Sequence, residues 1–184
     1  MTISVMSSTA QVFRFATVFG EMCLAWEGTT ADPRVMRIFL PKDAVAVRVP
    51  SSPIISPAVA ELGARIQAFL AGEAPVFDLG ILALDHCRDF QRQVLLAEAA
   101  ISRGWVSTYG RIAAHLGVPS ASRAVGNALA QNPFPIAIPC HRAVRANGAL
   151  GGYQGGLALK HSLLTTEGLT FDAQGRVLLT QVWY

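Results

Sequence analysis

The stretch that decides the fold is VSTYGRIAAHLGVPSASRAVGNALAQNP, residues 106–133. Ser107 or Thr108 is suited to start a short helix, which Gly117 ends. Pro119 then introduces a second helix that continues toward the end of the stretch. Two short helices joined by a tight turn predict a helix-turn-helix, although an ordinary helical hairpin in a core gives the same pattern.

The second predicted helix is lined with small side chains and has one long cation, Arg123. Helices that read the major groove usually present Arg, Asn or Gln to base edges. Small residues would instead let the helix approach a minor groove about 6 Å wide, where an Arg can enter the base stack. Close packing between helices is the alternative explanation. The small residues are Ser120, Ala121, Ser122, Ala124, Gly126, Asn127 and Ala128.

A reactive-cysteine pattern follows at Ile138-Pro139-Cys140-His141-Arg142. A thiol beside an imidazole and a fixed cation is typical of a nucleophile, and a chance Cys-His pair is the alternative. The two prolines of Asn132-Pro133-Phe134-Pro135 exclude a helix just before this run. Asn132 can bond neighbouring backbone amides, so we expect it to brace the cysteine loop.

Glycines surround Tyr153 on the other side of the cysteine run. So many glycines exclude a regular element and predict a mobile or close-approach loop beside the site. The glycines are Gly148, Gly151, Gly152, Gly155 and Gly156.

The first half of the chain predicts a small α/β unit. Residues 11–26 alternate in polarity and break at Gly20, which indicates a hairpin, and residues 34–40 predict another strand. A helix is expected over residues 58–70 and an extended apolar run over 76–84.

Helical periodicity begins at Asp89, which can cap a helix ending near Gly104. We therefore place an N-terminal α/β domain at residues 1–86 and a mostly helical domain with the helix-turn-helix at 87–170. The tail, 171–184, alternates around Gln174-Gly175 and suggests a hairpin.

Composition excludes several classes of protein. Of the 184 residues 52% are hydrophobic and 15% charged, which indicates a globular chain. No apolar run reaches the roughly 18 residues that cross a bilayer, and the N-terminus lacks the pattern of a secretory signal. We expect a cytoplasmic protein.

The three cysteines argue against a disulfide framework, because they are odd in number and widely spaced. Cys23 and Cys87 lack the paired spacing of a zinc site and predict small buried residues. His86 beside Cys87 leaves a weak metal alternative, but no metal is expected.

Charge is unevenly distributed along the chain. Residues 1–88 hold seven Lys/Arg against eight Asp/Glu, whereas residues 89–184 hold eight against four. The basic half is the Cys140 half, which gives modest support for a polyanionic partner.

Five segments in one register resemble the O6-alkylguanine-DNA alkyltransferases, the methylated-DNA–protein-cysteine methyltransferases. They are TYGRIA, SRAVGNAL, NPFPIAIPCHR, NGALGGYQGG and KHSLLTTEG, and the resemblance covers roughly residues 89–170. It implies a ribonuclease H-like α/β domain before the helical one. It also implies repair of DNA by irreversible transfer of a methyl or alkyl group from O6 of guanine to the protein, once per molecule. Whether O4-alkylthymine is a second substrate is not decided by the resemblance.

The resemblance assigns a catalytic group to the cysteine run. Cys140 is the nucleophile, and His141 is the base that acts through a water. Glu167 orients and stabilises the imidazolium, unless it is an ordinary solvated acid. Asn132 is the scaffold, and Lys160 assists near the site, unless it reaches solvent along a surface.

The resemblance also assigns DNA contacts. Arg123 enters the base stack as the target nucleotide is flipped out, and Tyr109 turns the target phosphate, unless Tyr109 is a half-buried core residue. Tyr153 covers the flipped base and donates to the alkylated oxygen, while the carbonyls of Cys140 and Ala143 read the guanine amino group. The remaining expected contacts are Ala121, Ala124, Gly126, Asn127, Arg142 and Pro135.

The implied partner is double-stranded DNA that contains O6-alkylguanine. The resemblance implies no cofactor, no membrane association and no obligate protein partner, and we expect a monomer. The chain departs from the family pattern at Ala143, where Val is usual, and at Ala146, where a hydroxyl residue is common. A non-catalytic protein that binds alkylated DNA and a helix-turn-helix regulator that senses alkylation are the alternative functions. Cys140 itself argues against the first, and the small-residue helix face argues against the second.

Overall fold

The computed structural model describes residues 10–184, which divide after Ala83 into two compact units. The first unit is a three-stranded antiparallel sheet in the order β1-β2-β3, with two helices. Thr17 pairs with Gly20 at the β1–β2 turn, so the predicted hairpin is confirmed. Gly20 has φ +114°, which favours glycine. The elements are β1 (Gln11–Thr17), β2 (Gly20–Gly28), β3 (Pro33–Phe39), α1 (Pro41–Ala44) and α2 (Pro57–Leu70).

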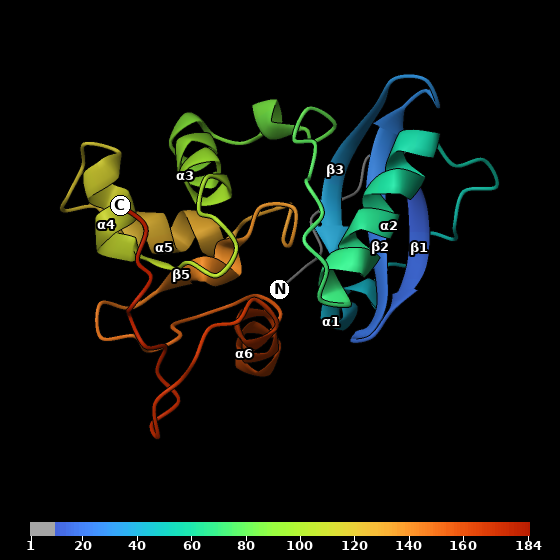
Figure 1. The fold of residues 1–184 in the computed structure, drawn as a ribbon. Helices are drawn as coiled ribbons and strands as arrows, with labels where there is room; N and C mark the ends of the chain where they lie inside the picture. The colour runs from blue at the N-terminus through green and yellow to red at the C-terminus, as the bar shows by residue number, and fades with distance from the viewer. Residues whose placement is uncertain (1–9) are drawn as a thin grey trace. The chain divides into compact units, whose positions relative to one another are not determined.

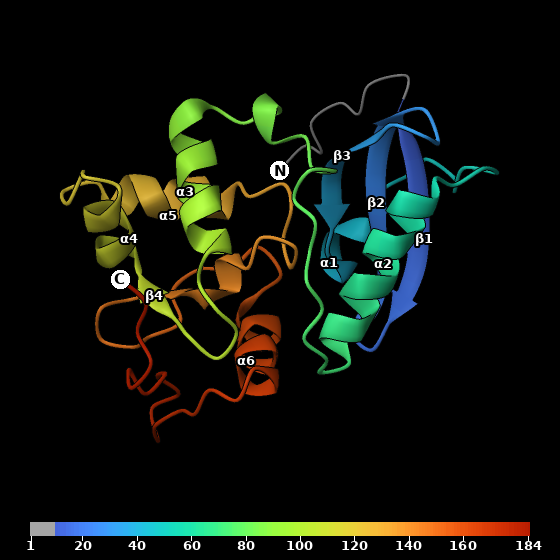
Figure 2. The ribbon, with the colours of Figure 1, turned by 45° about the horizontal axis from the view of Figure 1, so that its top comes forward.

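Helix α2 lies across one face of the sheet (Figures 1 and 2). Its apolar stripe is buried, as the sequence predicts, and Pro57 occupies the first turn, where its missing amide costs nothing. Gly63 permits close packing, because a Cβ there would lie 2.7 Å from Cε1 of Phe13. The buried residues of the stripe include Val59, Leu62, Ile66, Phe69 and Leu70.

The opposite face of the sheet packs against α1 and the segment after it, through a core cluster that includes Val12, Cys23 and Phe39. The expected extended run over 76–84 is only partly formed: among the described residues of this run, Leu82 alone forms a bridge, to Val35, and a turn precedes it. The Asp78 carboxylate accepts a hydrogen bond from the Gly80 amide, and this turn interrupts the run.

The second unit contains helices around a short parallel pair of strands, β4 and β5. In both views of the ribbon this pair lies between the α3–α5 group and α6 (Figures 1 and 2). The elements are η1 (Leu84–His86), α3 (Asp89–Ala99), β4 (Ser107–Thr108), α4 (Tyr109–His115), α5 (Ser122–Ala130), η2 (Cys140–Arg142), β5 (Ala143–Val144) and α6 (Leu157–Thr166).

Four helix ends test the predicted helix boundaries. Thr108 caps α4, because its Oγ1 accepts the Arg111 amide at 3.2 Å. Asp89 is the first residue of α3 and pairs with Arg92, so its predicted capping role is wrong, and α3 ends at Ala99, before Gly104. Helix α5 begins only at Ser122.

The tail lies along the second unit. Phe171 bridges to Val177 around a turn that the Asp172 carboxylate holds by accepting the amides of Gln174 and Arg176, each at 2.9 Å. Farther on, the Trp183 amide donates to the Val106 carbonyl at 2.8 Å. Among residues 10–184, no helix combines the length and apolarity that crossing a bilayer requires.

Candidate functional site

The loop before Cys140 is braced by Asn132, which is 1% exposed. Its Nδ2 donates to the Ile138 carbonyl at 3.0 Å, and its Oδ1 accepts the Phe134 amide at 2.9 Å. Ile136 has φ 76°, a conformation that costs a β-branched residue free energy and persists only where the surroundings enforce it. The loop therefore holds η2, and with it Cys140, in one place.

Cys140 is buried, at 5% exposed. Burial raises the pKa of its thiol to about 11, and the charge of Glu98 adds to this, while hydrogen bonds from Asn132 and Gln154 and the charge of Lys160 oppose it. The resting thiol is therefore protonated at neutral pH. It can act as a nucleophile only if a nearby group accepts its proton.

His141 supplies a neutral imidazole next to that thiol. The side chain is 0% exposed, and its Nε2 lies 2.7 Å from Oε1 of Glu167. Burial lowers the pKa of His141, together with the charges of Arg142 and Lys160, although Glu167 opposes this. A neutral ring bonded to a carboxylate can accept a proton and be stabilised once charged.

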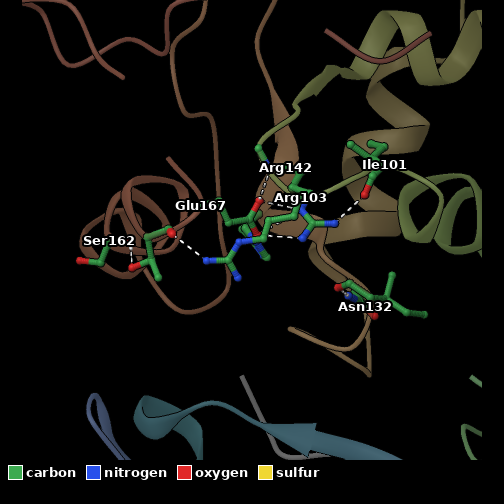
Figure 3. Close-up of polar contacts among 10 residues, drawn as sticks. Ile101, Arg103, Asn132, Arg142, Ser162 and Glu167 are labelled. Carbon is green, nitrogen blue, oxygen red and sulfur yellow. Dashed lines mark hydrogen bonds and ion pairs between the residues drawn. The ribbon is translucent and has the colours of Figure 1, made fainter. Parts of the chain in front are cut away.

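Glu167 is fixed by a buried guanidinium (Figure 3). Nε of Arg142 lies 2.9 Å from Oε2, and Nη2 lies 2.9 Å from Oε1, while Nη1 donates to the Ile101 carbonyl at 2.5 Å. Burial alone would raise the pKa of Glu167, but the hydrogen bonds and charges of His141 and Arg142 lower it to about 2. The carboxylate is therefore ionised throughout the neutral range.

Lys160 joins β5, the strand that follows Cys140 and η2, to the glycine-rich loop. Its Nζ donates to the carbonyls of Ala143 at 2.6 Å, Leu150 at 2.5 Å and Gly152 at 3.4 Å. The residue is 0% exposed, so a surface lysine that reaches solvent is excluded. Burial lowers the pKa of its ammonium to about 8.

Two tyrosines border the cysteine. The Tyr153 hydroxyl is buried with no hydrogen-bond partner among residues 10–184, and its ring meets His141 edge-on at 6.3 Å between centroids. The Tyr109 hydroxyl lies against Gly151, where a Cβ would come within 2.7 Å of it. Glycine at 151 therefore permits this close approach, and its φ of +69° also favours glycine.

Comparison of sequence and structure relates the chain to known proteins. The family model "6-O-methylguanine DNA methyltransferase, DNA binding domain" matches residues 89–169. The curated methylated-DNA–protein-cysteine methyltransferase of Methanosarcina acetivorans is 44% identical over 108 residues, which are 59% of this chain and 68% of that protein. The crystal structure of Mycobacterium tuberculosis OGT in complex with DNA has a TM-score of 0.72 at 32% identity, and the match covers 85% of this chain and 92% of that one.

The chain belongs to the O6-alkylguanine-DNA alkyltransferase family. A further relative, the methyltransferase of Methanothermobacter thermautotrophicus, is 43% identical over 117 residues, which are 64% of this chain. The chain matches 65% of that relative's length, so the aligned parts are about two thirds of each curated protein.

The structure gathers eight of the residues that the sequence predicts as catalytic or substrate-binding, two of which are Tyr109 and Ala143. The other six are Asn132, Cys140, His141, Tyr153, Lys160 and Glu167. Arg142 and Pro135 are also buried, and the guanidinium of Arg142 forms an ion pair with Glu167.

Three of the predicted DNA-contact residues on α5 face solvent. Arg123, Ala124 and Asn127 are exposed, and among the described residues Arg123 has no hydrogen bond or ion pair. Close helix packing therefore does not explain the small residue at 124. Of the other predicted contacts, Ala121 is half-buried. A Cβ built on Gly126 would lie 3.8 Å from the ring of Tyr109.

Two residues of the Cys140 site were not identified from the sequence. Gln154 donates to the Asn132 carbonyl at 3.0 Å and lies close enough to Cys140 to lower the pKa of its thiol. Glu98 is buried near the same thiol. The sequence feature that could have identified it is its position on the apolar face of α3, four residues after Val94. Of the other cysteines, Cys23 is buried as predicted, whereas Cys87 is only half-buried.

Proposed function

We propose that this protein repairs DNA by moving a methyl or alkyl group from O6 of guanine to Sγ of Cys140. The observation that carries the proposal is the buried row of Cys140, His141 and Glu167, in which the imidazole and the carboxylate are 2.7 Å apart. The relatives' names, and the DNA in the Mycobacterium tuberculosis complex, support the same reaction.

The proposed reaction is an SN2 displacement. The Cys140 thiol passes its proton through a water to His141, and the thiolate attacks the alkyl carbon as the bond to O6 breaks. Glu167 stabilises the imidazolium that forms. The Tyr153 hydroxyl, which is buried without a partner among the described residues, would donate to O6 and quench its developing charge.

The product explains why each molecule would act once. An S-alkyl cysteine is a thioether, and water does not hydrolyse it. Lys160 holds the Ala143 carbonyl by one hydrogen bond, and a carbonyl oxygen has a second lone pair that could accept the guanine amino group. Gln154 and Asn132 would hold the thiol in position.

DNA binding is assigned to the pair α4 and α5, which we propose is a helix-turn-helix for the minor groove. The exposed Arg123, flanked by small residues, would fill the stack when the damaged nucleotide is flipped out. Tyr109, at the start of α4, would turn the target phosphate. The domain assignment of residues 1–86, 87–170 and 171–184 and a ribonuclease H-like first domain belong to the same proposal. Three antiparallel strands followed by α2 support that first domain.

The experiment is a mass measurement after incubation with a duplex that contains O6-methylguanine. We expect one added methyl group on the peptide that contains Cys140, none in Cys140→Ser, and full transfer in the control Cys87→Ser. An unchanged mass of the wild-type protein after incubation with equimolar DNA would contradict the proposal.

Binding of the same duplex separates repair from simple recognition. Cys140→Ala removes the nucleophile and leaves α4 and α5 intact, so it should bind the damaged duplex as tightly as wild type. If binding were lost together with transfer, the assignment of DNA contacts to α4 and α5 would be wrong.

A further inference from the structure

Glu98 is a buried acid that the proposed reaction does not use. It is the penultimate residue of α3, and it is 0% exposed. Neither of its carboxyl oxygens has a hydrogen-bond partner among residues 10–184. A buried carboxylate without partners costs much free energy, so the group is expected to be neutral unless something pairs with it.

The two cations close to Glu98 are already committed elsewhere. Nζ of Lys160 donates to three backbone carbonyls, and the guanidinium of Arg142 is held by Glu167 and Ile101. Their charges still favour ionisation of Glu98, and so does the nearby amide of Ala143, although it makes no hydrogen bond of regular geometry to the carboxyl. Burial outweighs all three and raises the pKa of Glu98 to about 8.

Glu98 is close enough to Cys140 for its charge to matter. Helix α3 packs against η2, the turn that begins with Cys140. An ionised Glu98 raises the pKa of the Cys140 thiol and also that of Lys160. A negative charge in this core therefore works against the thiolate that the transfer needs.

We propose that Glu98 is a positioning acid of the Cys140 site, which holds a proton while the thiol reacts and opposes thiolate formation once it ionises. Glu98 makes and breaks no bond to the alkyl group. It acts through the charge that Cys140 experiences. The inference rests on the proposed function only for its effect on transfer from DNA.

The groups that face Glu98 come from four elements. They are Cys140 and Arg142 on η2, Lys160 on α6, Tyr109 on α4 and Tyr184 at the end of the tail. Burial raises the pKa of both tyrosines above 10, so they stay neutral as Glu98 titrates. Lys160, with a pKa of about 8, loses its charge over the same range as Glu98. A test must therefore separate these two groups.

The direct test is a carbon-13 NMR titration of protein labelled at Glu side-chain carboxyls and at Cys Cβ. We expect the Glu98 carboxyl, assigned by its loss in Glu98→Gln, to titrate near pH 8. In Glu98→Gln, which leaves Lys160 in place, the pKa of Cys140 should fall, and in Asp89→Asn, an exposed acid on the same helix, it should not change. A Glu98 pKa near the ordinary 4.5, or an unchanged Cys140 pKa in Glu98→Gln, would overturn the inference.

Methyl transfer supplies the second readout. Both rates should flatten above about pH 8, where Lys160 loses its charge, but the rate of Glu98→Gln should flatten less. Above pH 8 it should exceed the wild-type rate by about tenfold for each unit by which its Cys140 pKa is lower. If Glu98→Gln does not fold, the same measurement is made on Glu98→Leu. Identical pH profiles would overturn the inference. Coupled NMR titrations in a protein that transfers no methyl group would overturn the proposed function and support the role of Glu98.

Discussion

Two buried glutamates in the second unit lie at opposite extremes. At the end of α6, Glu167 is bonded by His141 and Arg142, and its pKa is about 2. Near the end of α3, Glu98 has no hydrogen bond among the described residues, and its pKa is about 8. Both side chains are removed from water, so burial does not explain the difference. Charged hydrogen-bond partners decide whether a buried carboxyl is a fixed anion or a neutral acid.

The largest effect is expected when the bonded carboxylate loses its charge. Glu167→Gln leaves the Arg142 guanidinium buried without a counter-charge, which costs roughly 3 to 5 kcal/mol of unfolding free energy at neutral pH. It also removes the group that stabilises the His141 imidazolium, so transfer should slow about 100-fold or more. Chemical denaturation and single-turnover transfer measure the two effects.

The same variant tests the pKa of Glu167 by its pH dependence. The folded pKa lies below the ordinary 4.5, so the carboxylate stabilises the protein above that value, and this is lost as the pH falls toward 2. The stability difference between wild type and Glu167→Gln should therefore shrink over that range. A constant difference would contradict the pairing.

The unbonded carboxyl should show the opposite dependence. The folded protein keeps the Glu98 proton between pH 4.5 and about 8, whereas the unfolded chain releases it, so Glu98 lowers stability as pH rises, by at most about 1.4 kcal/mol per pH unit. Glu98→Leu removes this slope. Denaturation of both proteins across the range measures it, and parallel stability curves would mean that Glu98 ionises in the fold.

A smaller effect is expected from the geometry of the bonded pair. Arg142→Lys keeps the positive charge beside Glu167 but loses the two-pronged bond and the bond to the Ile101 carbonyl. We expect a loss of about 2 kcal/mol. Stability equal to that of wild type would show that charge alone, without the guanidinium geometry, holds Glu167.

The smallest effect is expected at an exposed carboxylate. Asp172 accepts hydrogen bonds from two backbone amides and from Nε of Arg176, and these bonds lower its pKa. In Asp172→Asn, water screens the lost charge, so the melting temperature should scarcely move. A drop as large as that of Glu167→Gln would show that the number of bonds, and not burial with charge, sets the cost.

Local features of this fold could be predicted from the sequence. The hairpin at Gly20, the cap at Thr108 and the brace at Asn132 each depend on residues a few positions apart. The Pro-Cys-His-Arg run with its family motifs predicts a reactive thiol at Cys140, and this stays a prediction.

Long-range contacts could not be predicted in the same way. The Arg142 guanidinium bonds a carbonyl 41 residues away, and Ser107 bonds one 76 residues away. Lys160 is satisfied by three backbone carbonyls, which no side-chain pattern encodes. The place of Glu98 on an apolar helix face was visible, but its neutral state depends on Lys160 and Arg142 being committed elsewhere.

The most direct test of the account is the end point of a repair titration. A fixed amount of protein is incubated with increasing O6-methylguanine duplex, and the restored guanine is counted after the reaction has stopped. We predict a plateau at one guanine restored per protein molecule, with Cys140 methylated to the same extent. Continued turnover past that point, or restoration of guanine by Cys140→Ser, would contradict transfer to this cysteine.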